Sequence, residues 1–343
     1  MASIAFPTIS TSTRLPNGTT YSYAHVEPRD NKPYILFLHG WPDSSHGWHK
    51  QVPYFSDLGY GLIVPDLLGY GGTDKPEDLE AYRLKKMCGE VIGILDHHGI
   101  KEVVGVGHDW GSFLLSRMVN YHPTRFLKYI FLDVAYSPPT GAFDLDAINA
   151  TTEKALGYPI FGYWYFFNDA DAGKLMDENP ESIRTLKYTT SPSFMQKTMC
   201  PLNACRTYFL TSSTAPTTPT TPSPISPSPF TPTETSTFQQ IFSPTNGGFG
   251  PSLNWYKAQI RNLNAADESA VAEEDKVIRK EVLLVTCRDD AIAVPRLQEE
   301  GMRGFVGEEG RLLKVVEMGS GHFVQLERAG EVNECIRGFV EGE

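Results

Sequence analysis

The sequence lacks the features that mark several common classes of protein. It contains no run of basic residues and carries a formal net charge of −11, which argues against nucleic acid or an anionic membrane as a partner. Its most apolar run, residues 158–167, is too short to cross a bilayer, so we expect no membrane insertion. It has neither a phosphate-binding loop nor a dinucleotide-binding glycine pattern, and we therefore expect no cofactor.

Cysteine is also scarce. The five cysteines are odd in number and share no metal-type spacing with histidine, which predicts free thiols in a reducing compartment. The pairs His46/His49 and His97/His98 have no cysteine or carboxylate beside them in a metal-binding pattern, so we interpret them as surface residues and expect no metal. The N-terminus has no basic region followed by an apolar stretch, and a cytoplasmic location is the expectation.

Short apolar runs alternate with helical patterns along most of the chain. This alternation predicts an α/β fold with a mostly parallel central sheet flanked by helices. An Asn17-Gly18 turn predicts a hairpin, so the sheet begins antiparallel. We predict parallel strands over residues 34–38, 61–64, 102–106, 127–132, 282–286 and 312–316, and helices over residues 78–97, 110–121, 295–305 and 329–341.

The pattern changes between the fourth and fifth of these strands. Residues 137–264 are rich in aromatic side chains and helical patterns and contain no strand signal, which indicates a helical cap inserted into a core of residues 1–136 and 265–343. Within the cap, residues 211–237 are almost wholly Thr, Ser and Pro. Such a composition buries little apolar area, so this segment is predicted to be disordered or extended.

The most informative motif is Gly107-His-Asp109-Trp-Gly111, which lies between a predicted strand and a predicted helix. A nucleophile flanked by small residues in this context is typical of the sharp strand-to-helix turn of hydrolases. The central residue here is aspartate rather than serine. An aspartate that attacks a saturated carbon forms an ester that water can hydrolyse, whereas serine would form a stable ether. Asp109 is therefore the candidate nucleophile.

Two further segments supply partners for Asp109. His39-Gly-Trp41-Pro42 follows a strand, and the backbone amides of Trp41 and Trp110 are candidates to stabilise an oxyanion above Asp109. The Trp41-Pro42 bond is one of the few contexts in which a cis peptide is affordable. His322, between glycines and an aromatic residue after the last strand, is the candidate general base.

A carboxylate is needed to orient His322. Asp290, at the end of the strand that precedes it, is the choice over its neighbour Asp289. Asp133, at the end of a different strand, is the runner-up, although a turn-forming role is also open for it.

Together these segments resemble the soluble epoxide hydrolases of the α/β-hydrolase superfamily, over almost the whole chain outside the Thr/Ser/Pro-rich segment. The resemblance implies the α/β-hydrolase fold and two cap tyrosines that hydrogen-bond the epoxide oxygen. Tyr256, in Asn254-Trp-Tyr256, matches one of them; Tyr163 is the best match for the other, with Tyr165 as the alternative. Trp164 stands where the family often has glutamine, and so it is expected to shape the substrate pocket.

The resemblance implies hydrolysis of an epoxide to a vicinal diol, with the epoxide and water as the only partners. Monomer and homodimer are both compatible with the sequence. A haloalkane or haloacid dehalogenase would use the same aspartate and histidine, with the Trp110 indole holding the halide, but it has no need of paired phenols. A non-catalytic ligand-binding protein on a hydrolase scaffold is the alternative of another class, and its sign would be an incomplete triad.

Overall fold

A twisted eight-stranded sheet forms the centre of the computed structural model, which describes residues 1–189, 191–212, 231–307 and 310–343. The strand order is β1-β2-β4-β3-β5-β6-β7-β8. Strands β1, β2 and β4 pair antiparallel, and every later pairing is parallel. The strands are β1 (Ser10–Arg14), β2 (Thr20–Val26), β3 (Tyr34–Leu38), β4 (Gly61–Pro65), β5 (Val103–His108), β6 (Phe126–Leu132), β7 (Val282–Cys287) and β8 (Leu313–Met318).

The sequence-based expectations for the sheet are confirmed. The hairpin forms around Asn17-Gly18, with Gly18 at a φ of +91°. Each predicted parallel strand is present, although several extend one or two residues farther at the carboxyl end than predicted. The sheet is therefore mostly parallel with an antiparallel start.

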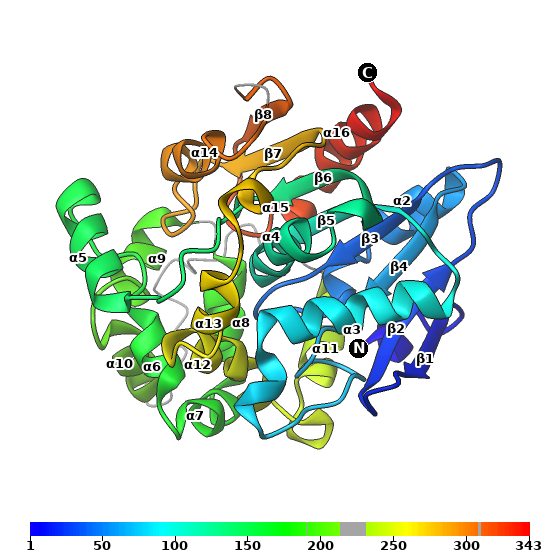
Figure 1. The fold of residues 1–343 in the computed structure, drawn as a ribbon. Helices are drawn as coiled ribbons and strands as arrows, with labels where there is room; N and C mark the ends of the chain where they lie inside the picture. The colour runs from blue at the N-terminus through cyan, green and yellow to red at the C-terminus, as the bar shows by residue number, and fades with distance from the viewer. Residues whose placement is uncertain (190, 213–230, 308–309) are drawn as a thin grey trace.

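Helices pack on both faces of the sheet (Figure 1). Alternate residues of each strand point to opposite faces: Leu36 joins the core that contains α3 and α4, whereas Ile35 and Phe37 join the core that contains α2 and α16. The helices are α1 (Ala2–Ala5), α2 (Gln51–Asp57), α3 (Leu84–His97), α4 (Trp110–Tyr121), α5 (Leu145–Leu156), α6 (Tyr163–Asn168), α7 (Ala172–Glu178), α8 (Pro180–Tyr188), α9 (Pro192–Thr198), α10 (Ala204–Ser212), α11 (Pro232–Ile241), α12 (Asn254–Ile260), α13 (Ala265–Ser269), α14 (Pro295–Arg303), α15 (Val324–Glu327) and α16 (Ala329–Glu341).

A helical insertion separates β6 from β7, as expected from the sequence. Helices α5, α6, α9 and α10 gather to one side of the sheet in Figure 1. No strand occurs in the part of the insertion that the structure describes. The domain bounds at residues 136/137 and 264/265 stay a prediction.

One prediction about this part of the chain needs correction. Residues 211–237 were expected to lack regular structure throughout, but α10 extends to Ser212 and α11 begins at Pro232. Thr231 and Glu234 cap α11 reciprocally, and a proline at the first helical position is compatible with this start, so the local sequence favours a helix. The remainder of the predicted segment, residues 213–230, lies outside the described residues.

The structure corrects two other predictions and confirms a third. The helix predicted from residue 78 is interrupted at Arg83, whose extended backbone separates a short 3₁₀ turn from α3. His46 is buried rather than on the surface and stacks on His49. The cysteines are free, as expected, and all except Cys335 are buried.

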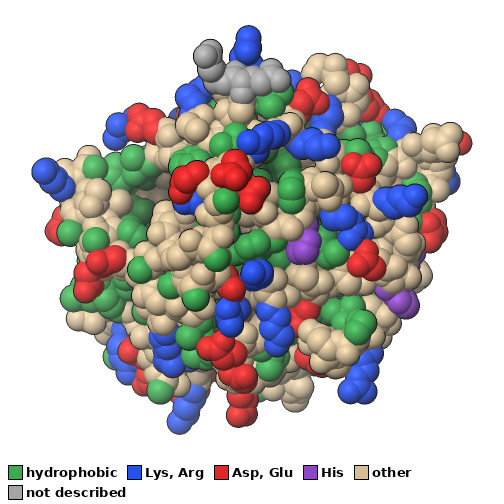
Figure 2. All heavy atoms as spheres, in the orientation of Figure 1, with side chains coloured by type: hydrophobic (Ala, Val, Ile, Leu, Met, Phe, Trp, Pro, Cys, Tyr) green, Lys and Arg blue, Asp and Glu red, His purple; other side chains and the backbone are tan. Residues whose placement is uncertain are grey.

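The surface is mixed in charge. In the face shown in Figure 2, acidic and basic side chains are interspersed and form no patch of one sign. Among the described residues, no helix is both long and apolar enough to cross a membrane.

A buried ion pair joins the insertion to the core. Lys187 of α8 lies with its Nζ 3.2 Å from Asp43 Oδ1, and both side chains are 1% exposed. The same Nζ donates to the carbonyl oxygen of Pro42 at 3.0 Å. Burial acts to raise the pKa of Asp43, but Lys187, together with two neighbouring histidines and the Ser44 amide, outweighs burial and holds this pKa below its usual value. The pair therefore ties α8 to the loop that follows β3.

We expect Lys187→Met to destabilise the protein by about 3–5 kcal/mol, because it leaves the Asp43 carboxylate buried without its cation. Urea unfolding followed by circular dichroism measures the change. Lys174→Met is the matched control: its partner Glu178 is exposed, as is Lys174 itself, and such a pair contributes at most about 1 kcal/mol. Equal unfolding midpoints for the two variants would contradict the role given to Lys187.

Candidate active site

Asp109 occupies a sharp turn between β5 and α4. Its backbone has a φ of +52°, which is rare for a residue other than glycine. The turn brings Gly111 against β3: a Cβ atom at Gly111 would lie 2.0 Å from the carbonyl oxygen of Leu38. At Gly107 a Cβ atom would lie 2.7 Å from the backbone of α4. Only glycine fits at these two positions, and the turn therefore presents the Asp109 side chain at the start of α4.

One oxygen of Asp109 is held by the loop after β3. The backbone N–H of Trp41 donates to Asp109 Oδ1 at 2.6 Å. The Trp41-Pro42 peptide is cis, as the sequence suggests. Gly40 lies so close that a Cβ atom there would be 2.1 Å from Oδ1. The amide of Trp110 is at the first position of α4, where an N–H has no partner within the helix, and its role toward Asp109 stays a prediction.

His322 faces the other oxygen of Asp109. It follows β8, and its Nε2 lies 3.7 Å from Asp109 Oδ2. The ring of His108 holds the His322 backbone, since its Nε2 lies 2.8 Å from the His322 carbonyl oxygen. His108, at the end of β5, therefore helps to hold the His322 imidazole next to the candidate nucleophile.

Two carboxyl groups approach the opposite side of the His322 ring. Asp290 Oδ2 and Asp133 Oδ2 each lie 2.7 Å from His322 Nδ1. Only Asp290 meets the angular requirements of a hydrogen bond to this nitrogen. Its other oxygen accepts from the amides of Ile292 and Ala293, whereas both oxygens of Asp133 are buried without a hydrogen-bond partner among the described residues. Asp290 is thus the better-aligned acid, and Asp133 completes a carboxyl pair.

The electrostatics differ between these two acids. Burial and the neighbouring Asp290 raise the pKa of Asp133 well above its usual range. Burial also acts to raise the pKa of Asp290, but the charge of His322 and its hydrogen bonds outweigh burial and lower this pKa to about 2. Burial opposes a charged His322, yet the Asp133–Asp290 pair, acting as one negative charge, and Asp109 together raise its pKa well above the usual value.

Two tyrosines extend from the insertion toward Asp109. Tyr163 begins α6, Tyr256 lies in α12, and their ring centroids are 6.1 Å apart. Burial and the charge of Asp109 raise the pKa of Tyr163 well above 10. Burial, Tyr163 and Asp109 do the same for Tyr256. Both phenols therefore keep their protons near neutral pH.

These groups line one cavity of about 380 Å³. Trp164 forms part of its wall and packs against Phe143, Phe161 and Tyr256. The Trp110 indole packs against both Trp164 and Tyr256. The residues of the predicted site that line this cavity are Trp41, Pro42, Asp109, Trp110, Tyr163, Trp164, Tyr256 and His322, while Asp290 lies behind His322.

Other candidates do not reach the cavity. Both ring nitrogens of His39 are used inside the core: Nδ1 lies 3.0 Å from the Gly40 carbonyl oxygen, and Nε2 accepts from the Leu67 amide. The hydroxyl of Tyr165 donates to Asp146 on the exposed side of α6. His39 therefore supports the loop after β3. Tyr163 lines the cavity and Tyr165 does not, while Asp290 rather than Asp289 hydrogen-bonds His322; the catalytic roles of Tyr163 and Asp290 stay predictions.

Sequence reasoning missed the far end of the cavity. Arg117 of α4 and Glu268 of α13 line it and form an ion pair at 2.8 Å, with both side chains almost fully buried. A spacing of eight residues separates Arg117 from Asp109 along α4, which corresponds to about 12 Å at the rise of an α-helix. The sequence around Arg117 does not indicate a buried ion pair, because Glu268 is 151 residues farther along the chain.

The order of the strands and the turn at Asp109 define the α/β-hydrolase fold. The sequence model described as "alpha/beta hydrolase fold" matches residues 33–154. In structure, the chain resembles epoxide hydrolase A from Mycobacterium thermoresistibile, with a TM-score of 0.74, 23% identity, and coverage of 97% of this chain and 98% of that one. A mutant epoxide hydrolase of Vigna radiata gives a TM-score of 0.77 at 24% identity, with the same coverage.

Sequence comparison finds relatives that match most of the chain. Epoxide hydrolase A of Mycobacterium tuberculosis is 27% identical over 317 residues, which are 90% of this chain and 91% of the relative. Bifunctional epoxide hydrolase 2 of Rattus norvegicus is 25% identical over 340 residues, and the match covers 96% of this chain but only 56% of the longer rat protein. Over most of its length the chain is thus similar to epoxide hydrolases of the α/β-hydrolase superfamily.

We expect Gly40→Ala to lower kcat/KM by about 10²-fold or more while the protein remains folded, because the added methyl displaces the Asp109 carboxylate. Turnover of an epoxide and circular dichroism provide the measurements. Gly89→Ala in α3 is the control, since its methyl meets no atom within 4 Å. Equal kcat/KM values for the two variants would contradict the expectation that close packing of Gly40 on Asp109 is needed for activity.

Proposed function

We propose that this protein is an epoxide hydrolase, an enzyme of the ether-bond hydrolase class, that converts epoxides to vicinal diols through a covalent ester of Asp109. The main support is that one cavity contains a carboxylate nucleophile, an imidazole beside it, and two protonated phenols. The family relationship supports the same activity.

The first step is opening of the epoxide ring. Asp109 Oδ2, the oxygen that Trp41 does not hold, attacks a ring carbon, and the C–O bond of the epoxide breaks. The alkoxide takes a proton from Tyr163 or Tyr256. General acid assistance of this kind contributes about 10²–10⁴-fold in rate. The product of this step is a hydroxyalkyl ester of Asp109 and one phenolate.

The charge of Asp109 controls the protonation of His322. In the resting protein, Asp109 is one of the groups that keep the proton on His322. Ester formation neutralises Asp109, so the pKa of His322 falls. The proton of the imidazolium is then transferred through solvent to the phenolate. His322 thus becomes a neutral base before the hydrolysis step, which requires a base.

The second step is hydrolysis of the ester. Neutral His322 removes a proton from water, and the hydroxide attacks the carbonyl carbon of the Asp109 ester. The negative charge develops on Oδ1, which already accepts from the Trp41 amide, and the Trp110 amide is the second donor. One donor of this kind is typically worth about 3–4 kcal/mol. The bond between Cγ of Asp109 and Oδ2 then breaks. The departing oxygen takes the proton of the added hydroxyl, the diol leaves, and Asp109 is again a carboxylate beside protonated His322.

The carboxyl pair behind His322 divides two roles. Asp290 carries the negative charge that orients the imidazole and stabilises its protonated form. Asp133 carries a proton, because a second buried carboxylate without hydrogen-bond donors would be too costly. The runner-up acid of the sequence therefore acts as a positioning residue.

The paired phenols distinguish this function from dehalogenation. A halide leaves without a proton, whereas an epoxide oxygen needs one, and Tyr163 and Tyr256 provide two protonated phenols in the cavity. The triad residues Asp109, His322 and Asp290 lie together, which argues against a non-catalytic binding protein. Halide release and diol formation separate the candidates in a direct assay.

We expect the protein to form diols from epoxides in a screen of aryl, aliphatic and fatty-acid substrates, and Asp109→Ala to abolish the activity. In His322→Gln, the ester forms but is not hydrolysed, so intact-protein mass spectrometry should detect one substrate molecule attached at Asp109. Single turnover of the wild type in ¹⁸O-water should place label in Asp109. Label in the diol alone, or turnover by Asp109→Ala, would exclude the covalent mechanism.

We expect Asp290→Asn to reduce kcat by about 10²-fold or more, because the neutral amide no longer stabilises the imidazolium. The same change removes a charge that raises the pKa of His322, so residual activity should persist to lower pH. Asp133→Asn, the matched variant, should retain kcat within about tenfold with little change in the pH profile. Equal losses and equal pH shifts in both variants would show that Asp133 shares the charge.

A further inference from the structure

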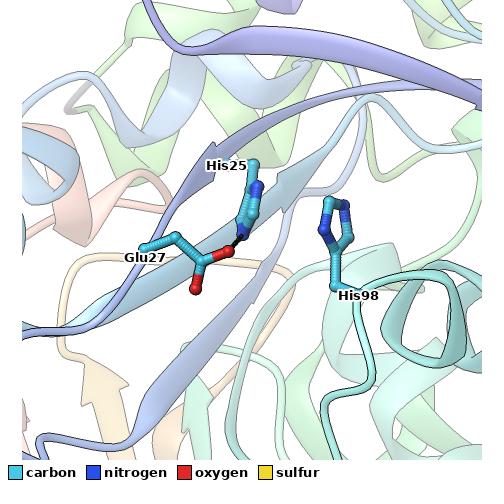
Figure 3. A group of neighbouring side chains, drawn as sticks. All are labelled: His25, Glu27 and His98. Atoms are coloured by element: carbon cyan, nitrogen blue, oxygen red, sulfur yellow. Dashed lines mark ion pairs between the residues drawn. The ribbon is translucent and has the colours of Figure 1, made fainter.

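Three ligand-forming side chains meet at the antiparallel edge of the sheet. His25 lies in β2, Glu27 follows that strand, and His98 follows α3 (Figure 3). One potential ligand atom from each residue lies within 4.8 Å of the others. None of the three lines the cavity that contains Asp109. The His25–Glu27–His98 cluster is therefore separate from the proposed catalytic site.

We propose that the His25–Glu27–His98 cluster binds a divalent transition-metal ion, with Zn²⁺ as the best fit. Two imidazole nitrogens and one carboxylate oxygen suit Zn²⁺ rather than Mg²⁺ or Ca²⁺, which prefer all-oxygen ligands. Ligands about 2.1 Å from a tetrahedral zinc lie about 3.4 Å from one another. His25 Nε2 and Glu27 Oε1 are separated by 3.4 Å.

Neighbouring tyrosines orient two of the ligands. The hydroxyl of Tyr23 lies 2.8 Å from His98 Nε2, which leaves Nδ1 of that ring for a metal. The hydroxyl of Tyr34 donates to Glu27 Oε2, which leaves Oε1. Metal-ligating histidines and carboxylates usually have such an outer hydrogen-bond partner on the atom that does not bind the metal. The cluster thus has both its ligands and part of their supporting shell.

His25 provides a second, independent observation. Its Nε2 is buried and has no hydrogen-bond partner, although it faces the Glu27 carboxylate. The rings of His25 and His98 are neighbours, with centroids 3.9 Å apart and an interplanar angle of 42° (Figure 3). A cation in the plane of the His25 ring, at Nε2, would satisfy the buried nitrogen.

The expected effect of binding is structural. The ion would join the end of α3 to β2, and a ligand that binds only the folded state raises stability in proportion to the logarithm of its concentration. Glu27 is 74% exposed, so the fourth coordination position opens to water. His25 and His98 are far apart in the chain, so no spacing in the sequence indicates this site.

The test uses the full chain after dialysis against EDTA. We expect saturable 1:1 binding of Zn²⁺ by titration calorimetry, a higher melting temperature with Zn²⁺, and the visible absorption of tetrahedral Co²⁺ when Co²⁺ is added instead. His25→Ala and His98→Ala should abolish all three signals. Tyr34→Phe should weaken binding about ten- to a hundredfold, because the outer partner of Glu27 is lost.

Controls make the result specific. His122→Ala removes a histidine outside the cluster and should bind Zn²⁺ like the wild type. His322→Gln should also bind normally, which separates this site from the proposed catalytic histidine. Glu27→Gln changes an exposed side chain with little risk to folding and should weaken binding at least tenfold. Absence of saturable binding in the wild type, or unchanged binding in His25→Ala and Glu27→Gln, would overturn the proposal.

Discussion

The imidazole of His322 is the group on which the rest of the proposed site depends. It touches Asp109 through one nitrogen and the Asp133–Asp290 pair through the other. Three carboxyl groups around one ring cannot all be charged at low cost in a buried site, so one of them must be protonated. A proton on Asp133 leaves two negative charges around a positive imidazole, and neutralisation of Asp109 then tips that imidazole toward the base form.

The sheet makes this arrangement possible. Asp109 follows β5, Asp133 follows β6, Asp290 lies beyond the end of β7, and His322 lies beyond β8; these four strands are neighbours in the sheet. In a parallel sheet the carboxyl ends of all strands meet at one edge. The insertion between β6 and β7 covers this edge and adds the two phenols. The buried Lys187–Asp43 pair ties that insertion to the loop whose amide holds Asp109.

Much of the site was predictable because its signals are local. Glycines around Asp109, the strand before it and the helix after it identify a turn that has few other uses. His322 was identifiable for the same reason. The choice between Tyr163 and Tyr165 was not local, since both lie in one aromatic run; it depends on which face of α6 turns toward α12. His39 sits in the right motif, but its ring nitrogens are used within the core.

The sequence by itself determined the parallel sheet, the position of the inserted helices and the candidate nucleophile and base, because strand periodicity and turn chemistry act over a few residues. Tertiary structure decided what depends on distant partners. It placed Asp133 beside Asp290, paired Arg117 with Glu268, and brought His98 to His25. Each of these contacts joins side chains whose separation along the chain carries no periodic signal, so only the packing of the folded molecule brings them together.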